Sequence, residues 1–198
     1  MDISRFDFFF RNPGRKIGLC FTCSPSGFSS WPESSCIALI QRLAADGNQL
    51  VMSVSPGADK LQAERLKKFS GVDICIAETT TLDECAALMR KLDLLVSVDT
   101  GQVHMAAAVG LPVLSLAGNT TTGTYPYSET GLSIATSPGC FDCRFIDACP
   151  SNRKKGRNHS AGYVPPCMAA LGVDTVYEYT RKMLENPRQR ERYHIVEG

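Results

Sequence analysis

Residues 99–104, Asp-Thr-Gly-Gln-Val-His, place an acid, a hydroxyl, a glycine and an imidazole at one predicted strand-to-helix junction. They follow the apolar run Leu94–Val98, which is typical of a buried parallel strand, and they lead into an alanine-rich helical segment at 102–109. Exposed N–H groups and the helix dipole favour an anion at a helix N-terminus, and open α/β sheets bind ligands at this edge. The junction therefore predicts a phosphate or diphosphate site.

A second group of residues with distinctive chemistry is a set of four cysteines, Cys140, Cys143, Cys149 and Cys167. They are separated by two, five and 17 residues, in a segment too polar to form an apolar core. Four thiolates suit a tetrahedral zinc or a single iron, and a site with no open coordination position is structural. We therefore expect one structural zinc or iron, the alternative being free cysteines in a loop.

These groups are positioned by a regular alternation of apolar runs and amphipathic segments. Strands are predicted at 16–22, 50–55, 73–77, 94–98 and 113–117, with 132–136 as a candidate sixth. The helices between and after them are predicted at 30–45, 58–69, 81–91, 102–109 and 175–185. The alternation predicts the α/β class, with a doubly wound, parallel, Rossmann-like sheet and right-handed crossovers. Capping boxes are expected at Ser30–Glu33 and Thr81–Glu84.

The chain divides into four predicted segments. Residues 1–15 are an N-terminal extension, 16–137 the Rossmann-like domain, 138–170 the four-cysteine metal loop, and 171–198 a C-terminal helix and tail. Residues 188–198 show no core pattern and are expected to fray. The extension contains an aromatic cluster, expected to meet the C-terminal helix or a second copy of the chain: Phe6, Phe8, Phe9 and Phe10.

Composition limits the function classes. The 198 residues suit one α/β domain with an appendage, and the net charge of +1 without a basic stripe argues against nucleic acid as a partner. No apolar run approaches the roughly 20 residues that a membrane span needs. Nine cysteines, an odd number spread through strands and helices, favour a reducing cytoplasm over a secreted disulfide framework. Cys20, Cys23, Cys36, Cys75 and Cys85 are interpreted as packing thiols.

Two common nucleotide signatures are missing from the sequence. No G-x-G-x-x-G follows the first predicted strand, and no G-x-x-x-x-G-K-[ST] is present. Oxidoreductases that use dinucleotides and P-loop enzymes are therefore disfavoured. Nucleotide-sugar enzymes and their relatives are the leading candidates for such a sheet, although fold alone decides nothing about function.

The segment 97–112, read as S-V-D-T-G-x-x-H-x-A-A-x-x-G-x-P, resembles the signature of the bacterial heptosyltransferases, glycosyltransferase family 9. Segments 29–32, 57–59 and 79–82 also fall in the order of that family. The resemblance covers roughly residues 15–185 and implies the donor-binding C-terminal half of a two-domain GT-B enzyme. Such enzymes transfer heptose from ADP-heptose to lipopolysaccharide or, in a protein-modifying branch, to adhesins. That branch has a similar four-cysteine metal finger.

The resemblance also implies roles for individual residues. Diphosphate contacts correspond to Thr100, Gly101 and His104, while Asp99 orients the loop and contacts the sugar. The acidic residue that contacts the ribose corresponds to Asp59, and the loop that contacts the edge of the adenine corresponds to residues 78–81, with Thr80. The hydroxyl residues Ser29 and Ser30 stand where the family usually has a basic residue that contacts the donor.

Each of these residues also has a purely structural interpretation. Asp99 could cap the following helix, His104 could be a satisfied core histidine, and Asp59 could be a first-turn helix acid. Trp31 is interpreted as a packing residue beneath the first loop.

In such a transferase the acceptor half supplies the base and the donor half stabilises the departing diphosphate, so no catalytic divalent metal is expected. Because few residues precede the first predicted strand, we expect the acceptor half to be missing from this chain. The expected partners are an ADP-sugar, a sugar or protein acceptor, and a second copy of the chain or a separate N-terminal half. The alternative is a non-catalytic binding or assembly module with the same fold.

Overall fold

The computed structural model describes residues 7, 10, 13–22, 30–118, 125–136, 164–189 and 192–196. Its centre is a seven-stranded sheet in the order β3-β2-β1-β4-β5-β6-β7, and every neighbouring pair of strands is parallel. The strands are β1 (Lys16–Cys20), β2 (Gln49–Val54), β3 (Cys75–Glu78), β4 (Leu94–Val98), β5 (Val113–Leu116), β6 (Gly131–Thr136) and β7 (Tyr193–Val196). The predicted doubly wound, Rossmann-like α/β fold is confirmed.

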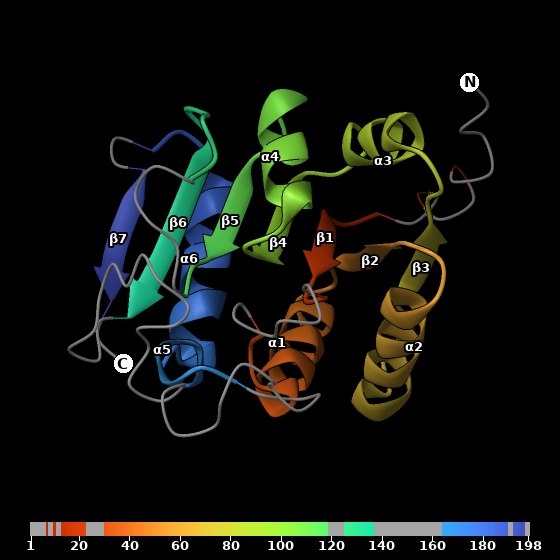
Figure 1. Cartoon of the computed structure of the whole chain (residues 1–198), viewed down its shortest axis with the longest axis horizontal. Coiled ribbons are helices and arrows are strands. Elements are labelled where there is room, and N and C mark those ends of the chain that lie inside the picture. Colours follow the sequence, from red (N-terminus) through yellow and green to blue (C-terminus); the bar gives the residue numbers. More distant parts are fainter. Residues whose placement is uncertain are drawn as a thin grey trace, which may run out of the picture.

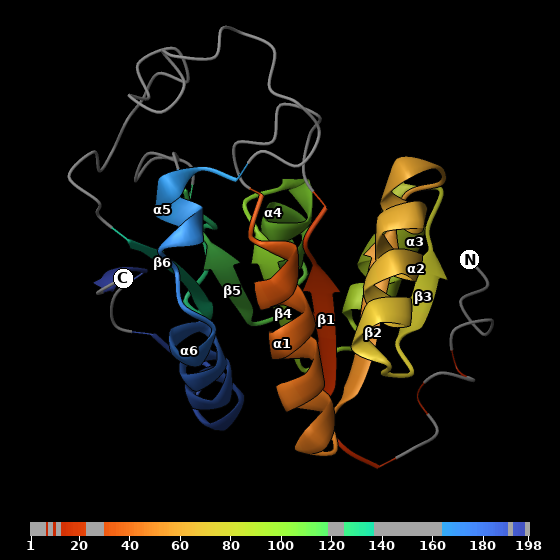
Figure 2. The same ribbon diagram turned by 90° about the horizontal axis from the view of Figure 1, so that it is seen from below.

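Helices cover both faces of this sheet. They are α1 (Glu33–Ala45), α2 (Ala58–Ser70), α3 (Leu82–Met89), α4 (Gly101–Ala108), α5 (Pro166–Ala169) and α6 (Val173–Glu185). Figures 1 and 2 show α1, α2 and α6 on one face and α3 and α4 on the other. Helix α1 packs between α2 and α6, and α4 packs on β4 and β5.

Strand β4 shows how the two helical layers share one sheet. All of its residues are buried. Leu94, Val96 and Val98 belong to the larger apolar cluster under α1, α2 and α6, whereas Leu95 belongs to the cluster under α3 and α4. Side chains alternate between the faces of a strand, so a strand covered on both sides reads as an unbroken apolar run. This is why the run at 94–98 marked the strand so clearly.

The strand order places a topological switch between β1 and β4. From β1 the chain proceeds through β2 to β3 at one edge, then returns to β4 and proceeds through β5 to β7 at the other. The loops that leave β1 and β4 therefore diverge to opposite faces, which opens a crevice at the carboxyl ends of these strands. The junction at 99–104 lies beside that crevice.

The C-terminal segment differs from the sequence prediction. The expected fraying tail is wrong for 193–196, which form β7 at the sheet edge beside β6. Two backbone hydrogen bonds hold the approach to this strand: Gln189 N donates to Glu129 O at 3.0 Å, and Ser133 N donates to Arg192 O at 2.9 Å. Helix α5 was also not predicted.

The predicted aromatic cluster near the N-terminus is described only at Phe10. This residue packs against the cluster of Val51, Ala77 and Leu88 on β2, β3 and α3, so its predicted contact with α6 is wrong, whereas contact with a second copy of the chain stays a prediction. Phe6, Phe8 and Phe9 lie outside the described residues. Trp31 is a packing residue as predicted: it is 4% exposed, and its Nε1 donates to Leu171 O at 2.9 Å.

The two predicted capping boxes have different outcomes. Thr81 caps α3, because its side-chain oxygen accepts from Glu84 N at 3.2 Å. The Glu84 carboxylate accepts from Thr80 N at 2.8 Å, which is one residue before the N-cap. The box at Ser30–Glu33 is wrong: α1 begins after Pro32, which makes no side-chain capping bond. Glu33 instead pairs with Arg65 of α2 at 3.0 Å.

Candidate functional site

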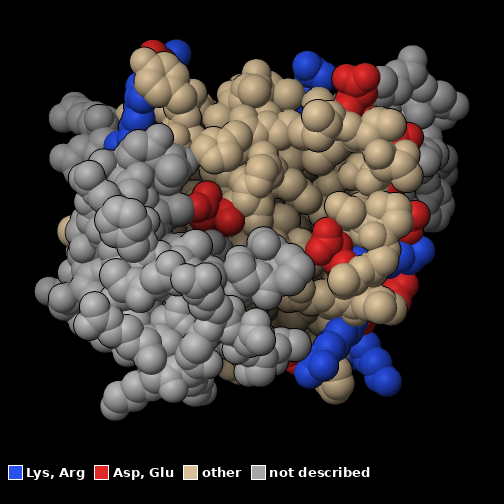
Figure 3. Space-filling model, viewed as in Figure 1, with Lys and Arg blue, Asp and Glu red and all other residues tan. Residues whose placement is uncertain are grey.

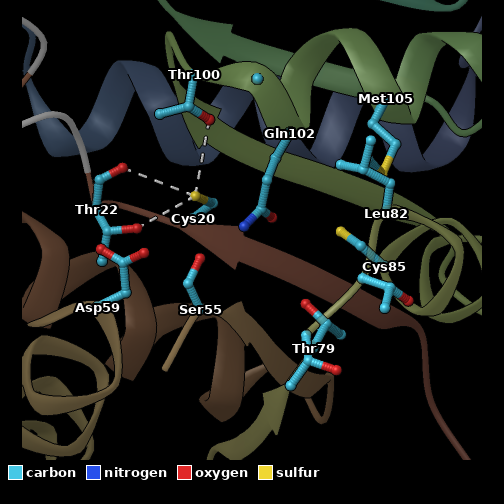
Figure 4. A pocket seen from close by; sticks show the side chains of 13 residues that line it. Cys20, Thr22, Ser55, Asp59, Thr79, Leu82, Cys85, Thr100, Gln102 and Met105 are labelled. Atoms are coloured by element: carbon cyan, nitrogen blue, oxygen red, sulfur yellow. Dashed lines mark hydrogen bonds between the residues drawn. The ribbon is translucent and has the colours of Figure 1, made fainter. Parts of the chain in front are cut away.

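A cavity of about 570 Å³ opens at the switch point (Figure 4). Its walls are the carboxyl ends of β1, β2 and β3 and the first turns of α2, α3 and α4. The lining residues are Cys20, Thr22, Ser55, Asp59, Thr79, Thr80, Thr81, Leu82, Cys85, Thr100, Gly101, Gln102 and Met105. The cavity thus lies where open α/β sheets bind their ligands.

The polar end of the cavity is built around Thr100. This residue is the N-cap of α4, and its side chain makes no capping bond to the helix backbone. Its hydroxyl instead lies 3.4 Å from Ser97 Oγ and 3.8 Å from Cys20 Sγ. Among the described residues, none has an atom within 4 Å of where a Cβ on Gly101, the first residue of α4, would stand, so the space beside this residue is open in the described part of the chain. An anion in this space meets free N–H groups and a hydroxyl.

Cys20 forms the floor beneath this end. Its thiol is 3% exposed and contacts the Thr22 hydroxyl at 3.7 Å and the Thr100 hydroxyl at 3.8 Å (Figure 4). Burial raises the pKa of Cys20 above its ordinary value, since desolvation disfavours the thiolate. Cys20 is therefore a neutral thiol rather than a nucleophile at neutral pH. It was predicted to be a packing thiol; it is buried, but it also lines the cavity.

The opposite end of the cavity is less polar. Leu82 is 76% exposed although it is a large apolar side chain, and Met105 and Cys85 lie near it. Thr79, at the end of β3, is buried and its hydroxyl lies 3.4 Å from Ser53 Oγ. An exposed aliphatic side chain at the mouth of a cavity provides a surface on which a flat ring can pack.

Asp59 is the only charged residue among the described lining residues. It lies in the first turn of α2, which follows Gly57 at a φ of 96°. Glycine adopts a positive φ without steric strain, so Gly57 lets the chain turn sharply out of β2 into the helix. Figure 3 shows Lys and Arg at the edges of the described surface on this side, with its middle mainly uncharged or acidic.

Four of the predicted donor-site residues line the cavity: Asp59, Thr80, Thr100 and Gly101. Ser30, Asp99 and His104 are not among the lining residues, and Ser29 lies outside the described residues. His104 is exposed, so its interpretation as a core histidine is wrong. The N-cap of α4 is Thr100 rather than Asp99, whereas Asp59 is a first-turn acid as the structural interpretation had it. The ligand contacts of all these residues stay predictions.

Two further lining residues, Thr79 and Thr81, belong to the predicted adenine-edge loop 78–81, so sequence reasoning missed seven lining residues. Ser55 comes directly after β2 and Thr22 follows β1 by two residues, and the rule applied to the end of β4 would have found both. The other five carry no such signal, because their placement depends on which strands are neighbours: Cys20, Leu82, Cys85, Gln102 and Met105.

Only Cys167 of the four-cysteine group lies within the described residues; Cys140, Cys143 and Cys149 lie outside them. Cys167 is in α5, and its carbonyl accepts from Thr136 Oγ1 at 2.6 Å. The last residue of β6 is thus tied to α5 across the cysteine-rich segment. Within the described ranges, no group of three or more His, Cys, Asp or Glu residues is arranged to hold a metal ion. The described helices include none that is long and apolar enough to span a membrane.

The parallel sheet, its switch-point cavity and the helices on both faces define a Rossmann-like, GT-B-type α/β fold. The sequence model of glycosyltransferase family 9 (heptosyltransferase) matches residues 6–144, and the chain belongs to this family. Lipopolysaccharide heptosyltransferase 3 of Escherichia coli is 31% identical over 96 residues, which are 47% of this chain and 28% of that protein.

Solved structures show the same fold. A glycosyl transferase family 9 protein from Veillonella parvula matches 92% of this chain and 50% of its own with a TM-score of 0.72 at 15% identity. The dodecameric, iron-containing heptosyltransferase TibC of E. coli, in complex with ADP-D-β-D-heptose, matches 89% of this chain and 46% of its own with a TM-score of 0.58 at 14% identity. The chain spans about half the length of these structures.

Proposed function

We propose that this chain is the donor-binding part of a heptosyltransferase-like glycosyltransferase and binds an ADP-sugar, ADP-heptose in particular. The observation that carries the proposal is the switch-point cavity, in which Thr100 and Gly101 open the N-terminus of α4. Family membership supports the sugar-transfer chemistry, and the complex of TibC with ADP-D-β-D-heptose supports the identity of the donor.

The two ends of the cavity suit the two parts of ADP. The diphosphate lies at the Thr100 end, where N–H groups and a hydroxyl are available. The adenine packs on Leu82 and Met105 at the opposite end, next to Thr80, and Asp59 holds the ribose. His104, Asp99, Ser29 and Ser30 complete the donor site around the phosphates and the heptose.

In the proposed reaction, an acceptor hydroxyl attacks the anomeric carbon as its proton passes to a base, and ADP leaves. The α4 N–H groups and the Thr100 hydroxyl stabilise the negative charge that develops on the departing diphosphate. No catalytic divalent metal takes part. The base and the acceptor site come from an N-terminal half, and the acceptor is lipopolysaccharide core or a protein.

One observation favours a second candidate, a non-catalytic binding or assembly module. The described lining of the cavity contains no Lys or Arg, although a diphosphate carries several negative charges. A module that has lost turnover would retain the fold while its affinity for the anion declined.

Calorimetry on the purified chain with ADP, ADP-heptose and a UDP-sugar tests the donor proposal. We expect ADP and ADP-heptose to bind and the UDP-sugar to bind more weakly, because a pyrimidine covers less of Leu82 and Met105. Absence of ADP binding at millimolar concentration would favour the non-catalytic module. Transfer of heptose after addition of a separately expressed N-terminal half would exclude it.

We also propose that Cys140, Cys143, Cys149 and Cys167 hold one structural zinc or iron. The hydrogen bond from Thr136 Oγ1 to Cys167 O holds the two ends of the cysteine-rich segment together. The ion would therefore stabilise a loop whose ends are already in contact. The iron in the related TibC supports this proposal. Elemental analysis should give one metal per chain, and Cys143→Ser should lose it while Cys36→Ser, a buried thiol of α1, retains it. Metal-free native protein would refute the proposal.

TibC is dodecameric, and we propose that this chain also forms a homo-oligomer. Native mass spectrometry tests this directly. A monomer at micromolar concentration would refute it.

A further inference from the structure

Gln102 occupies a position that the 97–112 signature leaves open, yet its side chain reaches across the cavity. It is the second residue of α4, and its Nε2 donates to the carbonyl oxygen of Ser53 in β2 at 3.0 Å. Strand β1 lies between β2 and β4 in the sheet, so the side chain passes over the carboxyl end of β1 (Figure 4). Gln102 therefore bridges the two sides of the switch-point crevice.

This bridge fixes the orientation of the amide. A carbonyl oxygen accepts only a donor, so the nitrogen must face Ser53 and the oxygen must face the other way. Gln102 Oε1 is buried, and none of the described residues donates a hydrogen bond to it. Buried acceptors in native proteins are nearly always satisfied, so this oxygen indicates a missing donor. Gln102 is one of the residues that line the cavity, so a ligand bound there lies beside this residue.

We infer that Gln102 is a specificity-determining residue of the donor site, whose Oε1 accepts a hydrogen bond from the nucleoside of the bound nucleotide-sugar. The inference rests on the proposed function. An ionised diphosphate has only acceptors, so it cannot satisfy an amide oxygen. The nucleoside has two sources of donors, the ribose hydroxyls and the amino group of the base. Gln102 thus selects for a donor-bearing nucleoside beside the phosphate position at Thr100.

Calorimetry with four probes tests this inference on the full chain: ADP, 2′-deoxy-ADP, 3′-deoxy-ADP and inosine diphosphate, in which a carbonyl replaces the amino group. We compare the wild type with Gln102→Met, which keeps the length of the side chain without a polar end. Gln41→Met is the matched control, because Gln41 Nε2 makes the same kind of bond, to Ser70 O at 3.1 Å, on an exposed part of α1.

The wild type should lose roughly tenfold in affinity for one of the three analogues, which identifies the donor group. Gln102→Met should bind ADP roughly tenfold more weakly than the wild type does. For this variant, ADP and the analogue that identifies the donor group should have the same affinity, because the side chain no longer has an acceptor. Gln41→Met should match the wild type for all four probes. Thermal unfolding of each variant shows that the chain remains folded.

Two outcomes would overturn the inference while leaving the proposed function intact. The first is unchanged ADP binding by Gln102→Met. The second is an equal loss for ADP and all three analogues, which would mean that Gln102 only braces α4 against Ser53. If the wild type binds no ADP, the proposed function and this inference both fail.

Discussion

Thr100→Val removes one hydroxyl from the polar end of the cavity and leaves the shape of the side chain nearly unchanged. The hydroxyl makes no capping bond within α4, and its contacts to Ser97 and Cys20 are long, at 3.4 and 3.8 Å. Little of the stability of the fold depends on it. The substitution therefore tests ligand binding with little effect on folding.

The expected loss of affinity follows from the charge of the partner. A hydrogen bond to a charged group contributes about 1.5–3 kcal/mol, so Thr100→Val should weaken ADP binding about 10- to 150-fold. The free energy of unfolding should change by less than about 1 kcal/mol, because only two weak neutral contacts are lost. Thr100→Ser keeps the hydroxyl and should recover most of the affinity.

Isothermal titration calorimetry with ADP and adenosine separates the possible explanations. Adenosine has no phosphate, so its affinity should be the same in the wild type and in Thr100→Val. An equal loss for ADP and adenosine would show a general distortion of the cavity. Unchanged ADP affinity in Thr100→Val would refute the placement of the diphosphate at the N-terminus of α4.

Three further predictions concern the stability of the fold. Trp31→Phe should lower the free energy of unfolding by roughly 1–3 kcal/mol in urea titrations followed by circular dichroism, because it leaves Leu171 O without its buried donor; an unchanged midpoint would contradict this. Burial raises the pKa of Cys75 from 9.0 to about 12, so the unfolded thiol ionises first and the free energy of unfolding should fall as the pH rises from 9 to 12. Cys75→Ala should make this decline with pH shallower, and the same decline in the variant as in the wild type would refute the argument. Gly14→Ala should lower Tm more than Gly71→Ala, since both have positive φ but only the Cβ at Gly14 would clash with Gly47 O; equal shifts would contradict the clash.

The sheet could be predicted from the sequence because its central strands are covered on both faces. Buried parallel strands give continuous apolar runs, and the helices between them have a different period. Strand β7 lacks this signal: its residues Tyr-His-Ile-Val are half-buried or exposed, and it lies at the edge of the sheet. Helix α5 has four residues, too few to show a helical period.

The phase of α4 explains why the interpretation of His104 as a core residue failed. Val103 and Ala106 are fully buried and lie three residues apart, so they define the inner face of the helix. His104 follows Val103 by one residue, a rotation of about 100°, and so faces outward. The helix is apolar on most sides, and the sequence alone did not show which side meets the sheet.

Only part of the candidate site could be predicted, because the order of the strands in the sheet decides which residues line the cavity together. The sequence identifies the end of β4 as a ligand edge, but it does not show that β1 separates β4 from β2. That order alone brings Gln102 to Ser53 and Cys20 beneath Thr100. Thr100 and Gly101, which the motif specifies, therefore lie at one end of the cavity, while most of the walls come from residues outside the motif.

Under the proposed function, the described site would have to bind its anion through neutral groups, because no Lys or Arg is among the described lining residues. Thr22, Thr100 and the N–H groups of α4 are dipoles held in place by the fold, and Asp59 is the one charged side chain among them. Dipoles fixed in advance need no reorganisation when charge develops nearby, so under the proposed function they would act in the transition state as well as in binding. Affinity of this chain for ADP and competence for transfer are therefore separate properties, and the first does not require the second.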